Sequence, residues 1–161
     1  MKFYFLFLMF PLLFSCQSEK FAKLKSNVGD ISFDEKQDDR NFKVCNSWVT
    51  QYFSLEKKFQ YFGEKQAIEE KFNKEFFRNS SENRSGYITI RFIVNCEGKT
   101  GYFRVEQMNS DYLKTEFNKD FVLELLKFVK NLDGWQNFEK KDYYQYLTFR
   151  IEDGKVVEIL P

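Results

Sequence analysis

The chain has 161 residues, with 25 Lys and Arg against 24 Asp and Glu and no histidine. The balanced charge offers no electrostatic attraction for nucleic acid, and the lack of histidine removes the commonest general base and the commonest zinc ligand. Aromatic residues make up 20% of the chain and include 21 Phe, so we expect one folded, Phe-packed domain with no catalytic residues, no metal site and no cofactor.

Residues 1–15 have the features of an export signal. Lys2 is followed by an apolar run from Phe3 to Phe14, which is shorter than the roughly 20 residues that span a bilayer and fits the apolar region of a secretory signal peptide. The run ends in Leu-Phe-Ser-Cys, which resembles the cleavage site of bacterial lipoproteins. That resemblance implies lipidation of Cys16 and a lipid-anchored protein of the cell envelope, on the periplasmic face of the outer membrane. An ordinary signal peptide with an incidental cysteine is the alternative.

The other two cysteines, Cys45 and Cys96, form an even pair once Cys16 is lipidated. Exported domains form disulfides in their oxidising compartment. We therefore expect a Cys45–Cys96 bond that ties the segment before the domain to the turn at Cys96, with two unpaired thiols as the alternative. Two cysteines without histidine do not predict a metal site.

Residues 16–41 are expected to form a polar tether. Charged residues dominate this stretch, and its apolar residues follow neither a helical nor a strand period, as is typical of flexible linkers. The acidic cluster within residues 34–39 lacks the glycine and spaced oxygens of a calcium loop, so its charges are interpreted as solvated. The domain would then comprise residues 42–161, and the aromatic spacing in residues 42–62 leaves helix and strand both open.

A helix and a β-hairpin are predicted next. Residues 64–77 carry apolar side chains at helical spacing after Gly63, which indicates an amphipathic helix. Residues 87–95 and 102–108 alternate between apolar and other side chains, which indicates two strands. Six residues, 95–100, join the two strands.

The connection between these strands contains Gly98-Lys99-Thr100, which matches the last three residues of a phosphate-binding loop. That loop requires another glycine five positions before its Gly-Lys and a helix after it. Ile93 occupies the first of these positions and a strand is predicted after the second, so both requirements fail. The connection is interpreted as a hairpin turn in which Gly98 supplies a positive φ.

The second half of the domain repeats this pattern of a helix followed by a hairpin. Thr115 or Asn118 can cap a helix that ends at Asp133-Gly134, with the glycine as its C-terminal cap. Residues 143–151 and 155–160 alternate as strands on either side of Asp153-Gly154, which is a two-residue hairpin signal. The order helix, strand, strand, helix, strand, strand predicts an α+β fold with a small antiparallel sheet and two helices.

From about residue 59 to residue 160 the chain resembles the C-terminal domain of TonB, in the version common in Bacteroidetes. The likeness is carried, in order, by "FQYFGEKQAIEEKF", "GYITIRFIVNCEGKTGYFRVEQM", "LKFVKNLDGW" and "YLTFRIEDG". Three features depart from the family: the usual Trp-x-Pro-Gly is Trp-Gln-Asn-Phe here, the proline after the first helix is missing, and there is no uncleaved anchor with a Pro-rich rod. The resemblance therefore implies this fold in a lipoprotein setting, without the energy-transducing role.

The same resemblance implies a non-catalytic adaptor that binds an envelope protein. The family's domain acts by β-augmentation, in which an extended partner segment pairs with a sheet edge. An edge can also pair with its own copy, which would give a homodimer. The alternatives are a structural subunit of an outer-membrane complex and a carrier of an apolar ligand. The expected edge is the last strand, at Lys155, Val156, Val157, Glu158 and Ile159, and the neighbouring Tyr143, Tyr144 and Tyr146 either stack on the partner or pack in the sheet.

Overall fold

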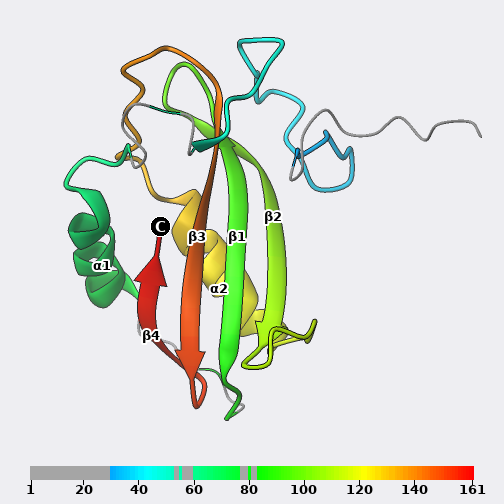
Figure 1. Cartoon of the computed structure of the whole chain (residues 1–161), viewed down its shortest axis with the longest axis vertical. Coiled ribbons are helices and arrows are strands. Elements are labelled where there is room, and N and C mark those ends of the chain that lie inside the picture. The colour runs from blue at the N-terminus through cyan, green and yellow to red at the C-terminus, as the bar shows by residue number, and fades with distance from the viewer. Residues whose placement is uncertain (1–29, 53–54, 56–59, 77–79, 81–82) are drawn as a thin grey trace, which may run out of the picture. The chain divides into compact units, whose positions relative to one another are not determined.

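The structure is a computed structural model that describes residues 30–52, 55, 60–76, 80 and 83–161. Residues 31–161 form one compact unit, which confirms the α+β class with a small antiparallel sheet and two helices. The expected export signal and the lipidated Cys16 lie outside the described residues. The elements are α1 (Glu64–Glu75), β1 (Gly86–Val94), β2 (Thr100–Asn109), α2 (Lys119–Lys130), β3 (Tyr143–Glu152) and β4 (Lys155–Leu160) (Figure 1).

The four strands form one antiparallel sheet in the order β2-β1-β3-β4, so β2 and β4 are its two edges. The predicted Asp153-Gly154 hairpin joins β3 to β4, and both of its residues have positive φ, at 47° and 75°, as a tight two-residue turn between twisted strands requires. Gly98 has a φ of 77° in the connection between β1 and β2. The hairpin interpretation of Gly98-Lys99-Thr100 is therefore confirmed.

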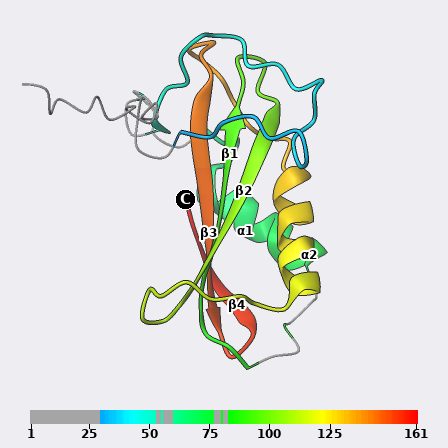
Figure 2. The ribbon, with the colours of Figure 1, turned by 90° about the vertical axis from the view of Figure 1, so that its right-hand side faces the viewer.

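Both helices lie on the same face of the sheet (Figure 2). Successive residues of a strand point to opposite faces, so alternate residues of β1 and β3 meet the helices in one core. The fully buried members from the sheet include Ile88, Ile90, Phe92, Leu147 and Phe149, and those from the helices include Ile68, Phe121, Leu125 and Val129.

The C-terminal ends of both helices differ from the sequence expectation, and α1 ends at Glu75 and not at residue 77. Asn118 caps α2, because its side chain accepts a hydrogen bond from the Phe121 N–H at 3.1 Å. The prediction that α2 ends at Asp133-Gly134 is wrong, since the helix ends at Lys130. Gly134 has a different role: a Cβ at this position would lie 2.7 Å from Cζ of Tyr61, so the glycine allows the Tyr61 ring to pack against the backbone.

Residues 31–50, which we call the N-terminal strap, pack on the sheet face opposite the helices. Ile31 is buried against Ile93 and Tyr144, and several strap residues add to this second apolar cluster, among them Phe42, Val44 and Val49. Residues 42–50 are irregular except for one bridge between Thr50 and Tyr143, so neither the helix nor the strand reading describes them. The compact unit begins at Ile31, whereas the sequence placed residues 31–41 in a flexible tether.

Candidate functional site: the two sheet edges and the strapped end

The C-terminal half of the β2 edge is occupied by the chain itself. After β2 the chain turns back, and the Asn109 N–H donates to the Leu113 carbonyl at 2.9 Å. The Thr115 N–H then donates to the Gln107 carbonyl at 3.1 Å. These bonds use main-chain groups that an added strand would need, so this part of the edge is closed to a partner.

The N-terminal half of β2 is overlaid by the strap. The ring of Phe42 lies over Gly101, where a Cβ would come within 2.4 Å of it. Three residues further along β2, Arg104 binds Asp38 and Ser32. Residues 109–115 therefore occupy main-chain groups of β2, and the strap covers one face of its N-terminal half. Among the described residues no such covering is found on β4, the other edge.

β4 pairs with β3 on one side, and α1 runs beside its other side (Figure 1). A groove of about 270 Å³ lies between them, and the Lys65–Glu158 ion pair joins α1 to β4 beside it. The groove is lined by Glu69, Phe72 and Asn73 of α1 and by Val156, Val157, Glu158 and Ile159 of β4.

The five β4 residues predicted from the sequence have different surroundings. Ile159 is 3% exposed and belongs to the core, and Val156 packs against the core in part. Lys155 is exposed, and Val157 is exposed by 46%. Glu158 forms ion pairs with Arg150 at 3.0 Å and with Lys65 at 3.8 Å. The side chain with most apolar surface available to a partner is therefore Val157.

The three tyrosines that the sequence placed near this edge lie in the half of β3 that β4 does not reach, and they make internal contacts. The Tyr143 hydroxyl donates to the Gln136 carbonyl at 3.1 Å, and burial raises the pKa of this phenol. The Tyr144 hydroxyl accepts from the Ile31 N–H at 3.4 Å. The Tyr146 hydroxyl lies 2.7 Å from that of Tyr52, and burial followed by this contact raises the pKa of Tyr146 to about 12. Of the two readings that the sequence left open, packing in the sheet describes them.

The strap is bonded covalently to the β1–β2 connection. Cys45 and Cys96 form a disulfide with a Cα–Cα distance of 6.0 Å, so the predicted pairing is confirmed. The Asp142 carboxylate lies close enough for its oxygen and the two sulfurs to be within 4.8 Å of one another. Both sulfurs are bonded to each other, so this group offers no thiolate to a metal ion.

Asp142 organises this end of the sheet, although the sequence did not single it out. The residue is fully buried. One carboxylate oxygen accepts from the main-chain and side-chain nitrogens of Asn46, and the other accepts from the Cys96 N–H at 3.0 Å. Its carbonyl accepts from the Thr50 N–H at 2.8 Å. A buried carboxylate needs such donors because desolvation of an unpaired charge is costly.

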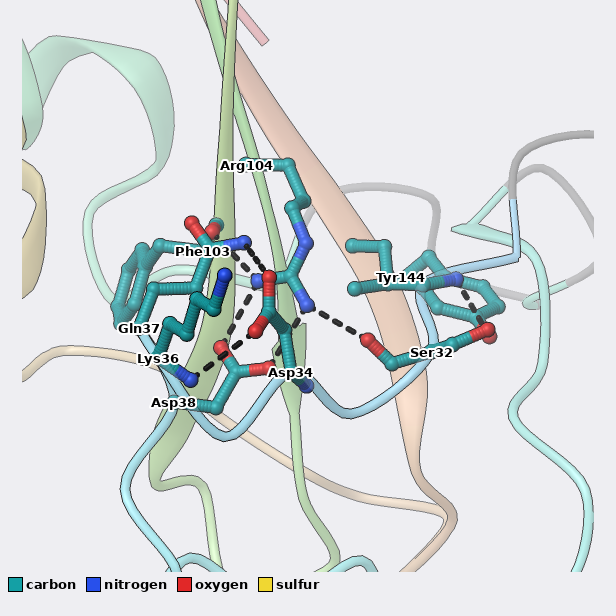
Figure 3. A network of polar contacts seen from close by, with 9 residues as sticks. Ser32, Asp34, Lys36, Gln37, Asp38, Phe103, Arg104 and Tyr144 are labelled. Carbon is teal, nitrogen blue, oxygen red and sulfur yellow. Dashed lines mark hydrogen bonds and ion pairs between the residues drawn. The ribbon is translucent and has the colours of Figure 1, made fainter.

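Arg104 fixes the other part of the strap to β2 (Figure 3). Its Nη1 and Nη2 donate to the two Asp38 oxygens at 2.8 and 2.7 Å, and Nη2 also donates to the Ser32 carbonyl at 2.6 Å. The Asp38 side chain is 1% exposed. The hydrogen bonds from Arg104, and next the one from the Asp34 N–H, lower the pKa of Asp38 against the opposing effect of burial.

This ion pair overturns the interpretation of Asp38 as solvated charge, whereas Glu35 and Asp39 of the same acidic cluster are exposed as expected. Asp38 is buried, and Asp34 caps the turn that leads to it by accepting from the Lys36 N–H at 3.0 Å and from Nε2 of Gln37 at 2.8 Å. The sequence signal that could have found this turn is the Asp at position 34 followed by polar residues, a pattern that favours Asx turns.

Across the part of the chain that the structure describes, no helix is long and apolar enough to span a membrane. No family model, curated protein sequence or solved structure matches the chain. The likeness to the C-terminal domain of TonB therefore stays a prediction.

Proposed function

We propose that the chain is a non-catalytic interaction module of the cell envelope that binds an extended segment of a partner protein along β4. The observation that carries this proposal is the contrast between the edges. β2 is covered by residues 109–115 and by the strap, whereas β4 borders an open groove. A strand edge with unpaired main-chain groups is a template for another strand.

Recognition at β4 would use the main chain first and the side chains second. Ile159 and Val156 support the strand from the core side, so they hold the edge in place and do not face the partner. Val157 stands at an irregular position of the β3–β4 pairing, between Val156 opposite Ile151 and Glu158 opposite Arg150. An extended segment could place one apolar side chain against Val157 and another in the groove beside Phe72.

The proposed setting is a lipid-anchored protein on the periplasmic face of the outer membrane. It is supported by the export signal and by the Leu-Phe-Ser-Cys sequence that ends at Cys16. It is also supported by the disulfide, because such bonds persist in exported proteins. In this setting the partner is another envelope protein, and a second copy of the chain is the simplest competing occupant of the same edge.

The test is cross-linking in the protein's own cells with Val157→Lys beside a matched control, Leu123→Lys. Lysine on an edge strand opposes strand addition. Leu123 is exposed by 50%, close to the 46% of Val157, but it lies on α2. Loss of a cross-linked partner with Val157→Lys alone supports the proposal. Retention of the partner with both variants would refute it and favour a fixed structural subunit, and cross-links between copies alone would make the edge a homodimer contact.

A further inference from the structure

Two exposed aromatic side chains stand at the end of the sheet where β1 ends and β3 begins. Trp48 is exposed by 58% and Phe138 by 60%. Three segments meet here, namely strap residues 43–50, the connection 95–99 and residues 136–142, and both views place them at one end of the fold (Figures 1 and 2). We call this the disulfide end, because the Cys45–Cys96 bond lies within it.

The backbone that carries these aromatics is held by many contacts. Trp48 lies between Asn46 and Thr50, and both of these residues bond to Asp142. Phe138 follows Asn137, whose Nδ2 donates to the carbonyls of Asn95 and Lys141 at 2.7 and 2.6 Å. The two side chains therefore project from a rigid base and need little reordering when they bind.

The charged residues of the disulfide end are mostly basic. The exposed residues Lys43, Lys99, Lys140 and Lys141 stand against Glu97 and Glu139, so the lysines are in excess by two. Lys99 and Lys141 are paired with these glutamates at 2.7 and 2.8 Å. The one other acid, Asp142, is buried beneath the loops. Aromatic side chains flanked by lysines are typical of surfaces that sit at the boundary between lipid headgroups and acyl chains.

The strap begins at this same end. The Ile31 N–H donates to the Tyr144 hydroxyl, and Tyr144 is the second residue of β3. Residues 17–30, which separate Cys16 from the strap, can extend to at most about 50 Å. A membrane anchor at Cys16 would therefore hold the end of the domain that carries Trp48 and Phe138 within about 50 Å of the bilayer.

We propose that the disulfide end rests on a lipid bilayer, with Trp48 and Phe138 inserted at the interface and the surrounding lysines at the headgroups. β4 pairs with Thr148–Glu152, the half of β3 away from this end. The β4 edge therefore stays accessible to a partner while the disulfide end contacts lipid. The inference does not depend on the partner at β4, and the Val157→Lys variant is expected to behave like the unaltered protein in a lipid assay.

Tryptophan fluorescence gives a direct test, because the chain has two tryptophans and Trp135 is only 6% exposed whereas Trp48 is exposed by 58%. The full chain, processed by its own cells, is reconstituted into phosphatidylethanolamine–phosphatidylglycerol vesicles with brominated acyl chains. We expect the bromines to quench Trp48, iodide in the water to be excluded from it, and Trp48→Phe to abolish the bromine quenching.

Two serine variants separate insertion from general adhesion. Phe138→Ser should lower the ratio of lipid-quenched to iodide-quenched Trp48 about tenfold, because it removes one of the two aromatic side chains that the proposal buries in lipid. Tyr112→Ser removes an aromatic exposed by 69% on residues 109–115 at the other end of β2, and should leave the quenching unchanged.

Two results would overturn the proposal. One is iodide access to Trp48 in the vesicles together with an absence of bromine quenching. The other is protection of Trp48 in whole-cell membranes but not in protein-free vesicles, which would assign the disulfide end to a protein partner. Neither result bears on β4, so a failure here remains distinguishable from a failure of the edge-strand proposal.

Discussion

Arg104 joins the strap to the sheet through two hydrogen bonds to the Asp38 carboxylate and one to the Ser32 carbonyl. We expect Arg104→Met to lower the free energy of unfolding by about 2–3 kcal/mol, because it leaves a buried carboxylate without its partner. Urea denaturation measures the loss. Arg91→Met on the paired position of β1 is the control: its ion pair with Glu106 is long, at 3.7 Å, and half-exposed, so its loss should stay below about 1 kcal/mol. Equal losses in the two variants would contradict the role of Arg104.

The Asp38 carboxylate also makes the strap sensitive to acid. Its pKa lies below the ordinary value of 3.8, chiefly because of the hydrogen bonds from Arg104. A group whose pKa is lower in the folded chain stabilises the fold above its unfolded pKa, and this contribution is lost as the pH falls through the folded pKa. We therefore expect stability to decline as the pH falls below about 4, and we expect the decline to be smaller in Asp38→Asn. Urea unfolding midpoints measured from neutral pH to strong acid follow this decline. Identical pH profiles for the unaltered protein and Asp38→Asn would contradict a role of the Asp38 carboxylate in the acid sensitivity.

The residues that sequence reasoning missed share one physical property. Asp38 and Asp142 are acids that a sequence reader assigns to the surface, because charged side chains are rarely buried. Each is buried here because donors from distant parts of the chain converge on it: Arg104 lies 66 positions from Asp38, and Cys96 lies 46 positions from Asp142. No residue near either aspartate in the sequence predicts these distant partners. The cysteine pair could be predicted, since a disulfide follows from the number of cysteines and the expected compartment.

At the scale of elements, the disulfide attaches the strap to the connection between β1 and β2. The bond closes a separation of 51 residues, and a loop of this size is expected to contribute about 2–4 kcal/mol to stability. We expect the double variant Cys45→Ser/Cys96→Ser to lose this amount in urea denaturation. Hydrogen exchange should rise first in residues 43–50, whereas β1 and β3 should stay protected.

Residues 31–38 provide the internal control for the disulfide variant. Arg104 still binds Asp38 when the cysteines are absent, so exchange in residues 31–38 should rise less than in residues 43–50. Uniform loss of protection across the whole strap would show that the strap and the sheet unfold together, and that the two attachments are not independent.

The elements themselves were largely predictable, because their periods are local properties of the chain. The alternation in β1 and β3 and the Asp153-Gly154 turn correspond to strands and a hairpin at those positions. The end of α2 was not predictable, because Gly134 is needed for the Tyr61 ring and not for a cap. The strap was missed for a different reason: it has no period, and the contacts that place it on the sheet join Ile31 and Asp38 to residues far away in the sequence.

At the scale of the whole domain, the two proposed surfaces lie at different ends of β3. The disulfide end lies at Tyr143, and β4 pairs with Thr148–Glu152. If the anchor and the aromatic pair hold the first of these ends against a membrane, the β4 edge lies beside the half of β3 that is farther from the membrane. This arrangement would present the groove between α1 and β4 to a partner that approaches from the aqueous side.

The point at which the domain starts distinguishes a strap from a tether. A chain that begins at residue 31 keeps Ile31 and the Asp38–Arg104 ion pair, whereas one that begins at residue 42 loses both but keeps the disulfide. We expect the longer chain to match the mature protein, and the shorter one to be less stable by about 3 kcal/mol, from one buried aliphatic side chain and one ion pair. Urea denaturation of the mature protein and of the two shortened chains measures these differences.

Equal stability of all three chains would mean that residues 31–41 act only as a tether. Arg104→Met in the longer chain divides the difference in unfolding free energy between the two shortened chains. The part of the difference that this variant removes belongs to the ion pair, and the part that persists belongs to Ile31 on the sheet.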